Sequence, residues 1–163
     1  MSYSDELAAD LFFINNGEID LLTGAMAPAR FNQIVERDLQ LSDRNLTQLS
    51  MICSNLNINT FLESRFKNSR LSKAQLKLEV ESELVSINFQ LRNTFRQSDC
   101  ISRTYQLGFW VLLVGKDQSD GNQLLSRSRQ KLPTYLDLNI SHRERRQSQL
   151  DWYSQIDRLQ LNN

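Results

Sequence analysis

The sequence predicts an all-α fold, a compact bundle of about six to eight helices in a single domain over residues 1–163. Only 5 glycines and 2 prolines occur among the 163 residues, so few positions interrupt a helix. Apolar side chains recur at steps of three and four along the middle of the chain, which is the spacing of one helical face. β-Branched residues do not gather in the alternating runs that are typical of strands.

We expect the bundle to be organised around residues 72–114. Ser72 and Gln75 form a capping box, because each side chain can bond the free backbone N–H of the other residue. Apolar residues then follow at helical spacing: Leu76, Val80, Leu84, Ile87, Leu91 and Phe95. The outer face of this long helix carries charged residues and is expected to be a solvated surface: Lys73, Lys77, Glu79, Glu81 and Glu83.

The most apolar run of the protein spans residues 107–114, and we interpret it as a buried helix. Ser98 and Asp99 are candidate caps that place a corner between the long helix and this run. On propensity alone, residues 112–114 could instead form a strand, because periodicity does not separate the two structures in so short a run.

Shorter helices are expected on both sides of this centre. Cap residues and apolar spacing predict helices over residues 5–14, 18–25, 28–39, 43–56 and 60–70. After residue 114, a loop extends from Gly115 to Gly121, a short basic helix falls within residues 122–139, and a capping box at Ser141 and Glu144 opens the last helix. His142 would then be a solvated residue in the first turn of that helix.

Composition favours a soluble, cytoplasmic protein. The two cysteines, Cys53 and Cys100, cannot form a disulfide framework, and the N-terminal residues are acidic where a signal peptide would be basic. The eight-residue apolar run is far shorter than the ~20 residues of a membrane-spanning helix.

Catalytic and metal-binding patterns are not recognisable, and we predict no enzyme activity, no metal and no cofactor. His142 stands among arginines, away from both cysteines, so neither a zinc site nor a nucleophile with its base is indicated. Neighbouring glutamates in the run Glu79, Glu81, Glu83 point about 200° apart on a helix and do not converge. The loop from Gly115 to Gly121 lacks the spacing of a phosphate-binding loop.

Charge is unevenly spread along a chain whose net charge is zero. Residues 1–60 carry three arginines against eight acidic residues, a net charge of −5, and residues 61–163 carry +5. Such asymmetry indicates an acidic partner for the C-terminal part, or attraction between the two halves within one copy or between copies.

Arginine-rich groups are the candidate binding residues for the backbone of RNA or single-stranded DNA. Three groups are indicated by their expected positions. Arg92, Arg96 and Arg103 share one face if the long helix is continuous; Arg127, Arg129 and Lys131 flank the loop from Gly115 to Gly121; and Arg143, Arg145 and Arg146 lie in the first turn of the last helix. The alternative is that these are ordinary surface residues paired with acidic side chains.

In its length, its expected helices and its distributed arginines, the whole chain resembles the helical small subunit of CRISPR effector complexes, although it has no signature motif of that family. The resemblance implies a non-catalytic subunit of a larger assembly, which contacts neighbouring protein subunits and nucleic-acid backbone through the arginine groups. The alternative function is a protein–protein adaptor with charge-driven self-association and no nucleic-acid binding.

A second, local resemblance covers about a dozen residues. Residues 107–110, with Cys100, Arg103 and Tyr105 before them, are similar to a stretch in the helical carotenoid-binding domains of cyanobacterial photoprotective proteins. This resemblance implies a third function, that of a small pigment-binding domain.

Overall fold

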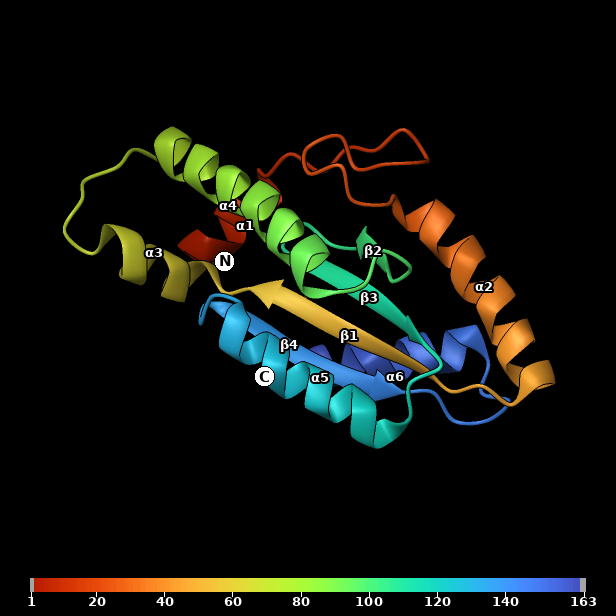
Figure 1. Cartoon of the computed structure of the whole chain (residues 1–163). Helices are drawn as coiled ribbons and strands as arrows, with labels where there is room; N and C mark the ends of the chain where they lie inside the picture. The colour runs from red at the N-terminus through yellow and green to blue at the C-terminus, as the bar shows by residue number, and fades with distance from the viewer. Residues whose placement is uncertain (1, 162–163) are drawn as a thin grey trace.

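The structure, a computed structural model, describes residues 2–161 and has an α/β fold (Figure 1). Its described part contains six helices and one four-stranded antiparallel sheet with the strand order β2-β3-β1-β4. The prediction of an all-α bundle is therefore wrong. None of the described helices is long and apolar enough to cross a membrane.

The elements alternate along the chain. The helices are α1 (Tyr3–Ala9), α2 (Pro28–Asn45), α3 (Ile58–Phe66), α4 (Lys73–Thr94), α5 (Gln118–Lys131) and α6 (Gln149–Leu161). The strands are β1 (Leu49–Leu56), β2 (Cys100–Arg103), β3 (Gly108–Val114) and β4 (Leu136–His142).

Strands β1 and β3 replace two of the predicted helices. Strand β1 pairs with β3 from Leu49 opposite Val114, and with β4 from Leu56 opposite Leu136, so it is a central strand. Both strands are buried over nearly all their length, because helices cover both faces of the sheet. Strands buried on both faces lose the alternation of apolar and polar residues that identifies a half-exposed strand. The strand alternative for residues 112–114 was correct, and the strand begins earlier, at Gly108.

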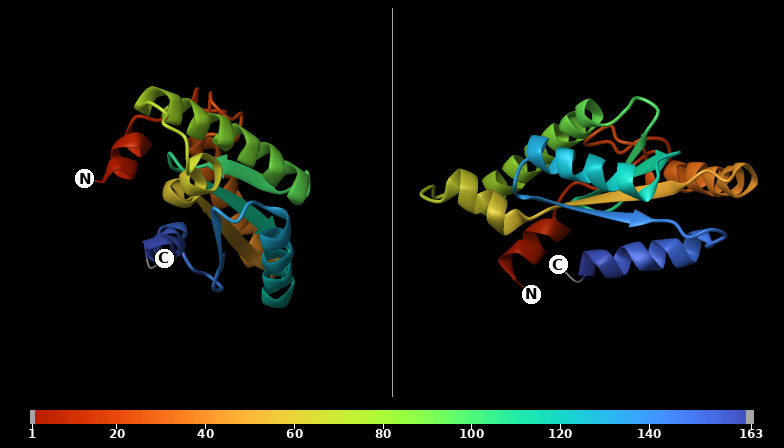
Figure 2. Two further views of the ribbon diagram at one scale, coloured as in Figure 1. Left: turned by 90° about the vertical axis from the view of Figure 1, so that its left-hand side faces the viewer. Right: turned by 60° about the horizontal axis from the view of Figure 1, so that its bottom comes forward.

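Helices form a layer on each face of the sheet (Figure 2). One core cluster joins α1, α3, α4 and α5 to the face of the sheet that includes Ile52 and Val111. The other joins α2 and α6 to the opposite face through Phe31, Trp110 and Trp152. Helices α4 and α5 therefore lie on the same face of the sheet.

Helix α4 is the element that the sequence predicted best. Ser72 and Gln75 form the expected capping box, and Val80, Leu84 and Leu91 are buried. Its predicted outer face is wrong in two respects. Glu83 is buried and accepts a hydrogen bond from the Tyr135 hydroxyl, and apolar side chains are exposed beside Lys73 and Glu79 on the outer face.

Candidate functional site

A basic cavity lies at the end of α4, and its first wall is the turn that follows this helix. The backbone N–H of Arg96 donates to Asp99 Oδ2 at 2.9 Å, and the N–H of Asp99 donates to the Arg96 carbonyl at 3.0 Å. These two bonds close residues 96–99 into a turn that leads directly into β2. The Asp99 carboxylate is thereby bound to the Arg96 backbone, and both residues line the cavity.

The second wall is one face of α5 and the connection before it. Gly115 has a φ of 76°, a left-handed conformation that glycine adopts without strain, and it turns the chain from β3 toward Lys116. Helix α5 then presents Leu124, Arg127, Ser128 and Lys131, which lie at steps of three and four on one face of the helix.

The cavity between these walls has a volume of about 200 Å³. Its charged lining residues are Arg96, Lys116, Arg127 and Lys131, against the single carboxylate of Asp99. Within residues 2–161, none of these four cationic side chains forms a hydrogen bond or an ion pair. Four unpaired cations around one small cavity repel each other, and an anion bound there would relieve that repulsion.

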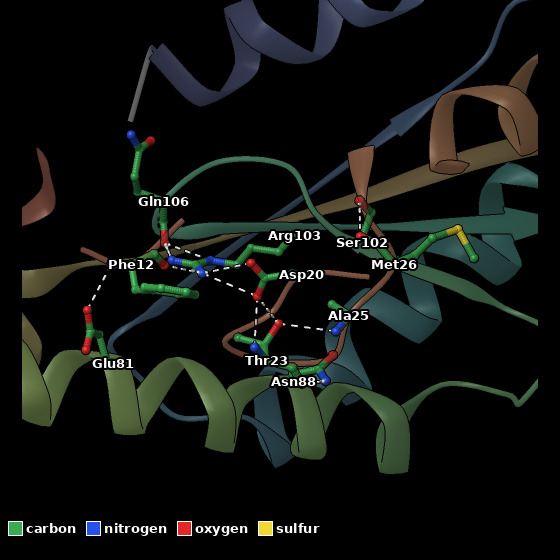
Figure 3. Close-up of polar contacts among 10 residues, drawn as sticks. All are labelled: Phe12, Asp20, Thr23, Ala25, Met26, Glu81, Asn88, Ser102, Arg103 and Gln106. Atoms are coloured by element: carbon green, nitrogen blue, oxygen red, sulfur yellow. Dashed lines mark hydrogen bonds and ion pairs between the residues drawn. The ribbon is translucent and has the colours of Figure 1, made fainter. Parts of the chain in front are cut away.

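Arg103, a predicted binding residue, has a structural role instead (Figure 3). Its side chain is fully buried, and its Nη1 donates to the Phe12 carbonyl at 2.8 Å and forms an ion pair with Asp20 at 3.2 Å. Its Nε and Nη2 donate to the Gln106 carbonyl, and the Phe13 ring lies 4.9 Å below the guanidinium carbon. Burial lowers the pKa of Arg103, and the nearby Asp20 carboxylate acts in the opposite direction.

Three more of the predicted arginines hold the fold. Arg92 donates to the Gly24 carbonyl at 2.7 Å, and Arg129 donates to the Leu138 carbonyl at 2.8 Å. Arg143 is almost fully buried and pairs with Asp43 at 2.8 Å. Each of these three guanidinium groups therefore binds a partner within the chain, although Arg92 and Arg129 are exposed.

The remaining predicted residues divide between the basic cavity and another surface. Arg96, Arg127 and Lys131 come together at the basic cavity from two different sequence groups. Arg145 and Arg146 are exposed, and Arg145 lines a different cavity, beside His142. Lys116 and Asp99 also line the basic cavity but were not predicted as binding residues. Two features of the sequence could have indicated them: Arg127 and Lys131 are four residues apart, on one face of a helix, and Arg96 and Asp99 are close enough to share a turn.

His142 is not in a helix but ends strand β4. Its Nδ1 lies 2.8 Å from Ser50 Oγ and its Nε2 lies 3.1 Å from Asn122 Oδ1. Burial lowers the pKa of His142, which favours the neutral imidazole. The expectation of a solvated histidine is therefore wrong.

A second polar cavity of about 510 Å³ lies where β1, β4, α6 and the β2–β3 turn meet. Its lining includes Asn55, Asp137 and Asn139, together with Tyr105, whose hydroxyl donates to Asp157 Oδ1 at 2.7 Å. Burial raises the pKa of Tyr105. Between residues 2 and 161, no group of three or more His, Cys, Asp or Glu side chains is placed to hold a metal ion.

Comparison with solved structures identifies the fold. The chain is similar to the GGDEF domain of FimX from Pseudomonas aeruginosa, with a TM-score of 0.69, 15% identity and coverage of 86% of this chain and 90% of that one. It is also similar to the GGDEF domain of DgcB from Caulobacter crescentus in complex with c-di-GMP, with a TM-score of 0.66, 9% identity and coverage of 89% and 86%.

A third similar structure contains an enzyme. This is the diguanylate cyclase SiaD of Pseudomonas aeruginosa in complex with its activator SiaC, with a TM-score of 0.66, 16% identity and coverage of 95% of this chain and 58% of that one. No protein-family model and no curated protein sequence matches the chain. The domain name, read as one-letter codes, is Gly-Gly-Asp-Glu-Phe, and this chain contains no two adjacent glycines.

These likenesses show that the chain has the fold of GGDEF domains. They overturn the predicted relation to CRISPR small subunits, and with it the predicted functions of a nucleic-acid-contacting subunit, a helical adaptor and a pigment-binding domain. The prediction that the protein is not an enzyme rested on the absence of recognisable catalytic and metal-binding patterns. It is contradicted by the fold, which a diguanylate cyclase shares.

Proposed function

We propose that this chain is a cyclic-dinucleotide signalling domain that binds c-di-GMP at the basic cavity between the end of α4 and helix α5. The observation that carries the proposal is the convergence of Arg96, Lys116, Arg127 and Lys131 on one cavity without partners among the described residues. The choice of ligand is supported by the fold, because DgcB, which has a similar structure, was solved with c-di-GMP.

The charges of the cavity match the groups of this ligand. A cyclic dinucleotide carries two phosphodiesters, and arginine binds phosphate oxygens through a planar fork that fits them better than a lysine ammonium. Arginine and lysine also donate to O6 and N7 of guanine. The carboxylate of Asp99 can accept the guanine N1–H and N2–H groups, a pair of donors that adenine lacks.

The size of the cavity limits what it can enclose. Cavities that enclose a drug-sized ligand have volumes of about 300–1,000 Å³, whereas this one has about 200 Å³. We therefore expect one guanine with its phosphate to enter the cavity, and the other half of the ligand to remain at the surface.

Location and domain organisation are part of the same proposal. Cys53 and Cys100 are both free thiols, which fits a reducing, cytoplasmic compartment. We regard residues 1–163 as one domain, so that the ligand site and the sheet belong to one folding unit.

The test is isothermal titration calorimetry with c-di-GMP in the absence of GTP, so that the measurement does not depend on turnover. Arg96→Ala and Arg127→Ala should each weaken binding at least about tenfold, because each removes a charge-assisted hydrogen bond worth about 1.5–3 kcal/mol. Arg145→Ala is the matched control, an exposed arginine outside the cavity, and should leave the affinity within about twofold.

Selectivity provides the second arm. Cyclic di-AMP should bind more weakly than c-di-GMP, and Asp99→Asn, which keeps an oxygen for the Arg96 backbone N–H, should reduce this difference. Wild-type protein that does not bind c-di-GMP at low salt would refute the proposal, as would equal losses in the Arg145 and Arg96 variants.

A further inference from the structure

The sequence has a single histidine, and the structure places it where strand β1, strand β4 and helix α5 meet. His142 Nδ1 lies 2.8 Å from Ser50 Oγ of β1, and its Nε2 lies 3.1 Å from Asn122 Oδ1 of α5. An amide oxygen can only accept a hydrogen bond, so Nε2 carries the proton and Nδ1 accepts from the Ser50 hydroxyl. Both hydrogen bonds are therefore complete in the neutral imidazole.

Protonation of the ring breaks this arrangement at Ser50. A proton on Nδ1 leaves the ring with two donors and no acceptor, so the Ser50 hydroxyl has to turn its hydrogen away. Ser50 is only 1% exposed, and between residues 2 and 161 its hydroxyl has no hydrogen-bond partner besides this ring. A buried hydroxyl without an acceptor and a charged ring without a counter-charge both cost free energy. The imidazolium is therefore disfavoured in the place that the neutral ring occupies.

A cavity of about 570 Å³ beside the ring offers the imidazolium another position. Asp43 and Arg143, which both line it, pair with each other. Strand β1 carries no charged residue, and Asp120 of α5 is exposed outside this cavity. The remaining charged residues of the lining are Asp117, Glu144 and Arg145. The two carboxylates outnumber the one guanidinium, so a charged ring that turns into the cavity meets a net negative lining.

The start of α5 depends on where this ring lies. A Cβ at Gly121 would lie 3.0 Å from His142 Cε1, so the helix packs directly against the ring, and Asn122 is bonded to it. A ring that turns into the cavity removes both contacts from the first turns of α5. The bond from Arg129 to the Leu138 carbonyl, near the other end of the helix, stays in place. Protonation therefore loosens the start of α5 and not the whole helix.

The same part of the chain carries one wall of the basic cavity. Lys116 directly precedes Asp117, the N-cap of α5, and Arg127 lies on the helix itself. The opposite wall, with Arg96 and Asp99, follows α4 and has no contact with the histidine. A shift at the start of α5 therefore changes the position of Lys116 relative to that wall.

We propose that His142 is a pH switch: the neutral ring holds the start of α5 against β4, and protonation releases it and weakens ligand binding at the basic cavity. Binding favours the neutral ring, so by linkage the affinity falls as the pH falls. Histidine is the side chain whose ordinary pKa lies between pH 5 and 8, and this chain has one. The effect on c-di-GMP rests on the proposed function, whereas the release of α5 does not.

Hydrogen exchange of the ligand-free full chain tests the release. After correction for the intrinsic effect of pH on exchange, residues 116–123 should exchange at least about threefold faster at pH 5.0 than at pH 7.5. The variant His142→Gln, which cannot be protonated, should show no such difference. Asn122→Asp should also keep its protection at pH 5.0, because it gives the charged ring a carboxylate where the ring lies. Equal protection of wild type at both pH values, or the same loss in His142→Gln or in α6, would overturn the switch.

Calorimetric titration with c-di-GMP at the same two pH values tests the coupling. The affinity of wild type should fall at least about threefold at pH 5.0, and that of His142→Gln should not. Wild type that binds equally at both pH values, or His142→Gln that loses as much affinity, would overturn the coupling. Wild type that binds at neither pH would refute the proposed function, and the exchange experiment would still decide whether His142 releases α5.

Discussion

Arg103 and Asp20 show at the residue scale what a buried charge requires. Their ion pair is fully enclosed, and Asp20 also accepts hydrogen bonds from the backbone and hydroxyl of Thr23. Asp20→Asn should destabilise the protein by about 3–5 kcal/mol, because it leaves the guanidinium buried without a counter-charge. Urea unfolding measures this loss. Arg30→Ala removes an ion pair with Glu18 in which both side chains are exposed, and it should change stability by less than about 1 kcal/mol; a similar loss in both variants would contradict the argument.

His142 should make the stability of the protein depend on pH. Burial lowers its pKa in the folded state, so the unfolded chain binds a proton more readily than the folded chain does. The stability contributed by the neutral imidazole is complete above the unfolded pKa of about 6.5, and it is lost as the pH falls through the lower folded pKa. Melting temperatures measured between about pH 7.5 and 5.5 should therefore fall more steeply for wild type than for His142→Gln. Parallel curves for the two proteins would show that His142 does not contribute.

At the scale of elements, a substitution of Gly121, in the first part of α5, compares the cost of a steric clash with the gain in helix propensity. Alanine is a better helix former than glycine by about 1 kcal/mol. A Cβ at this position would, however, lie 3.0 Å from His142 Cε1 and 3.0 Å from Ile140 Cδ1, inside van der Waals contact. Gly121→Ala should therefore destabilise the protein by about 1–3 kcal/mol in urea unfolding. An increase in stability would mean that β4 moves away at little cost.

Local signals identified helix α4 but not the strands, and they also predicted a helix over residues 18–25 that the structure does not contain. The capping box of Ser72 and Gln75 and the apolar spacing of α4 lie within a few residues of each other, so the sequence alone predicted the helix correctly. Strand β1 has no comparable signal, because Met51 and Cys53 face one helix layer while Ile52 faces the other. The alternation that marks a strand appears only when one face is solvated.

At the scale of the whole molecule, the arrangement of helices and strands determines which charged side chains lie close together. Arg96 follows α4 and Arg127 lies on α5, and they share a cavity because both helices pack on one face of a sheet whose strand order is β2-β3-β1-β4. That order is a consequence of long-range pairing, which the spacing of residues in the sequence does not encode. The sequence could therefore nominate both arginines as binding residues, but it also nominated Arg103 and Arg143, whose ion pairs with Asp20 and Asp43 depend on equally distant contacts.

Ligand binding should stabilise the entire chain, and this effect tests the basic cavity as the ligand site. A ligand present at 100 times its dissociation constant adds about 2.7 kcal/mol to the free energy of unfolding. For a chain of 163 residues this corresponds to a rise in melting temperature of roughly 5–10 °C. Differential scanning calorimetry with c-di-GMP should show the rise in wild type and not in an Arg96→Ala, Arg127→Ala double variant.

The Phe89→Asp variant is the control for this measurement, because its substitution lies on the outer face of α4, away from the basic cavity. It should keep the full rise in melting temperature. The rise should shrink as salt is added, because ions screen the cationic lining of the cavity. A rise that the Phe89 variant loses and the double arginine variant keeps would place the ligand on the outer face of α4 and not in the basic cavity.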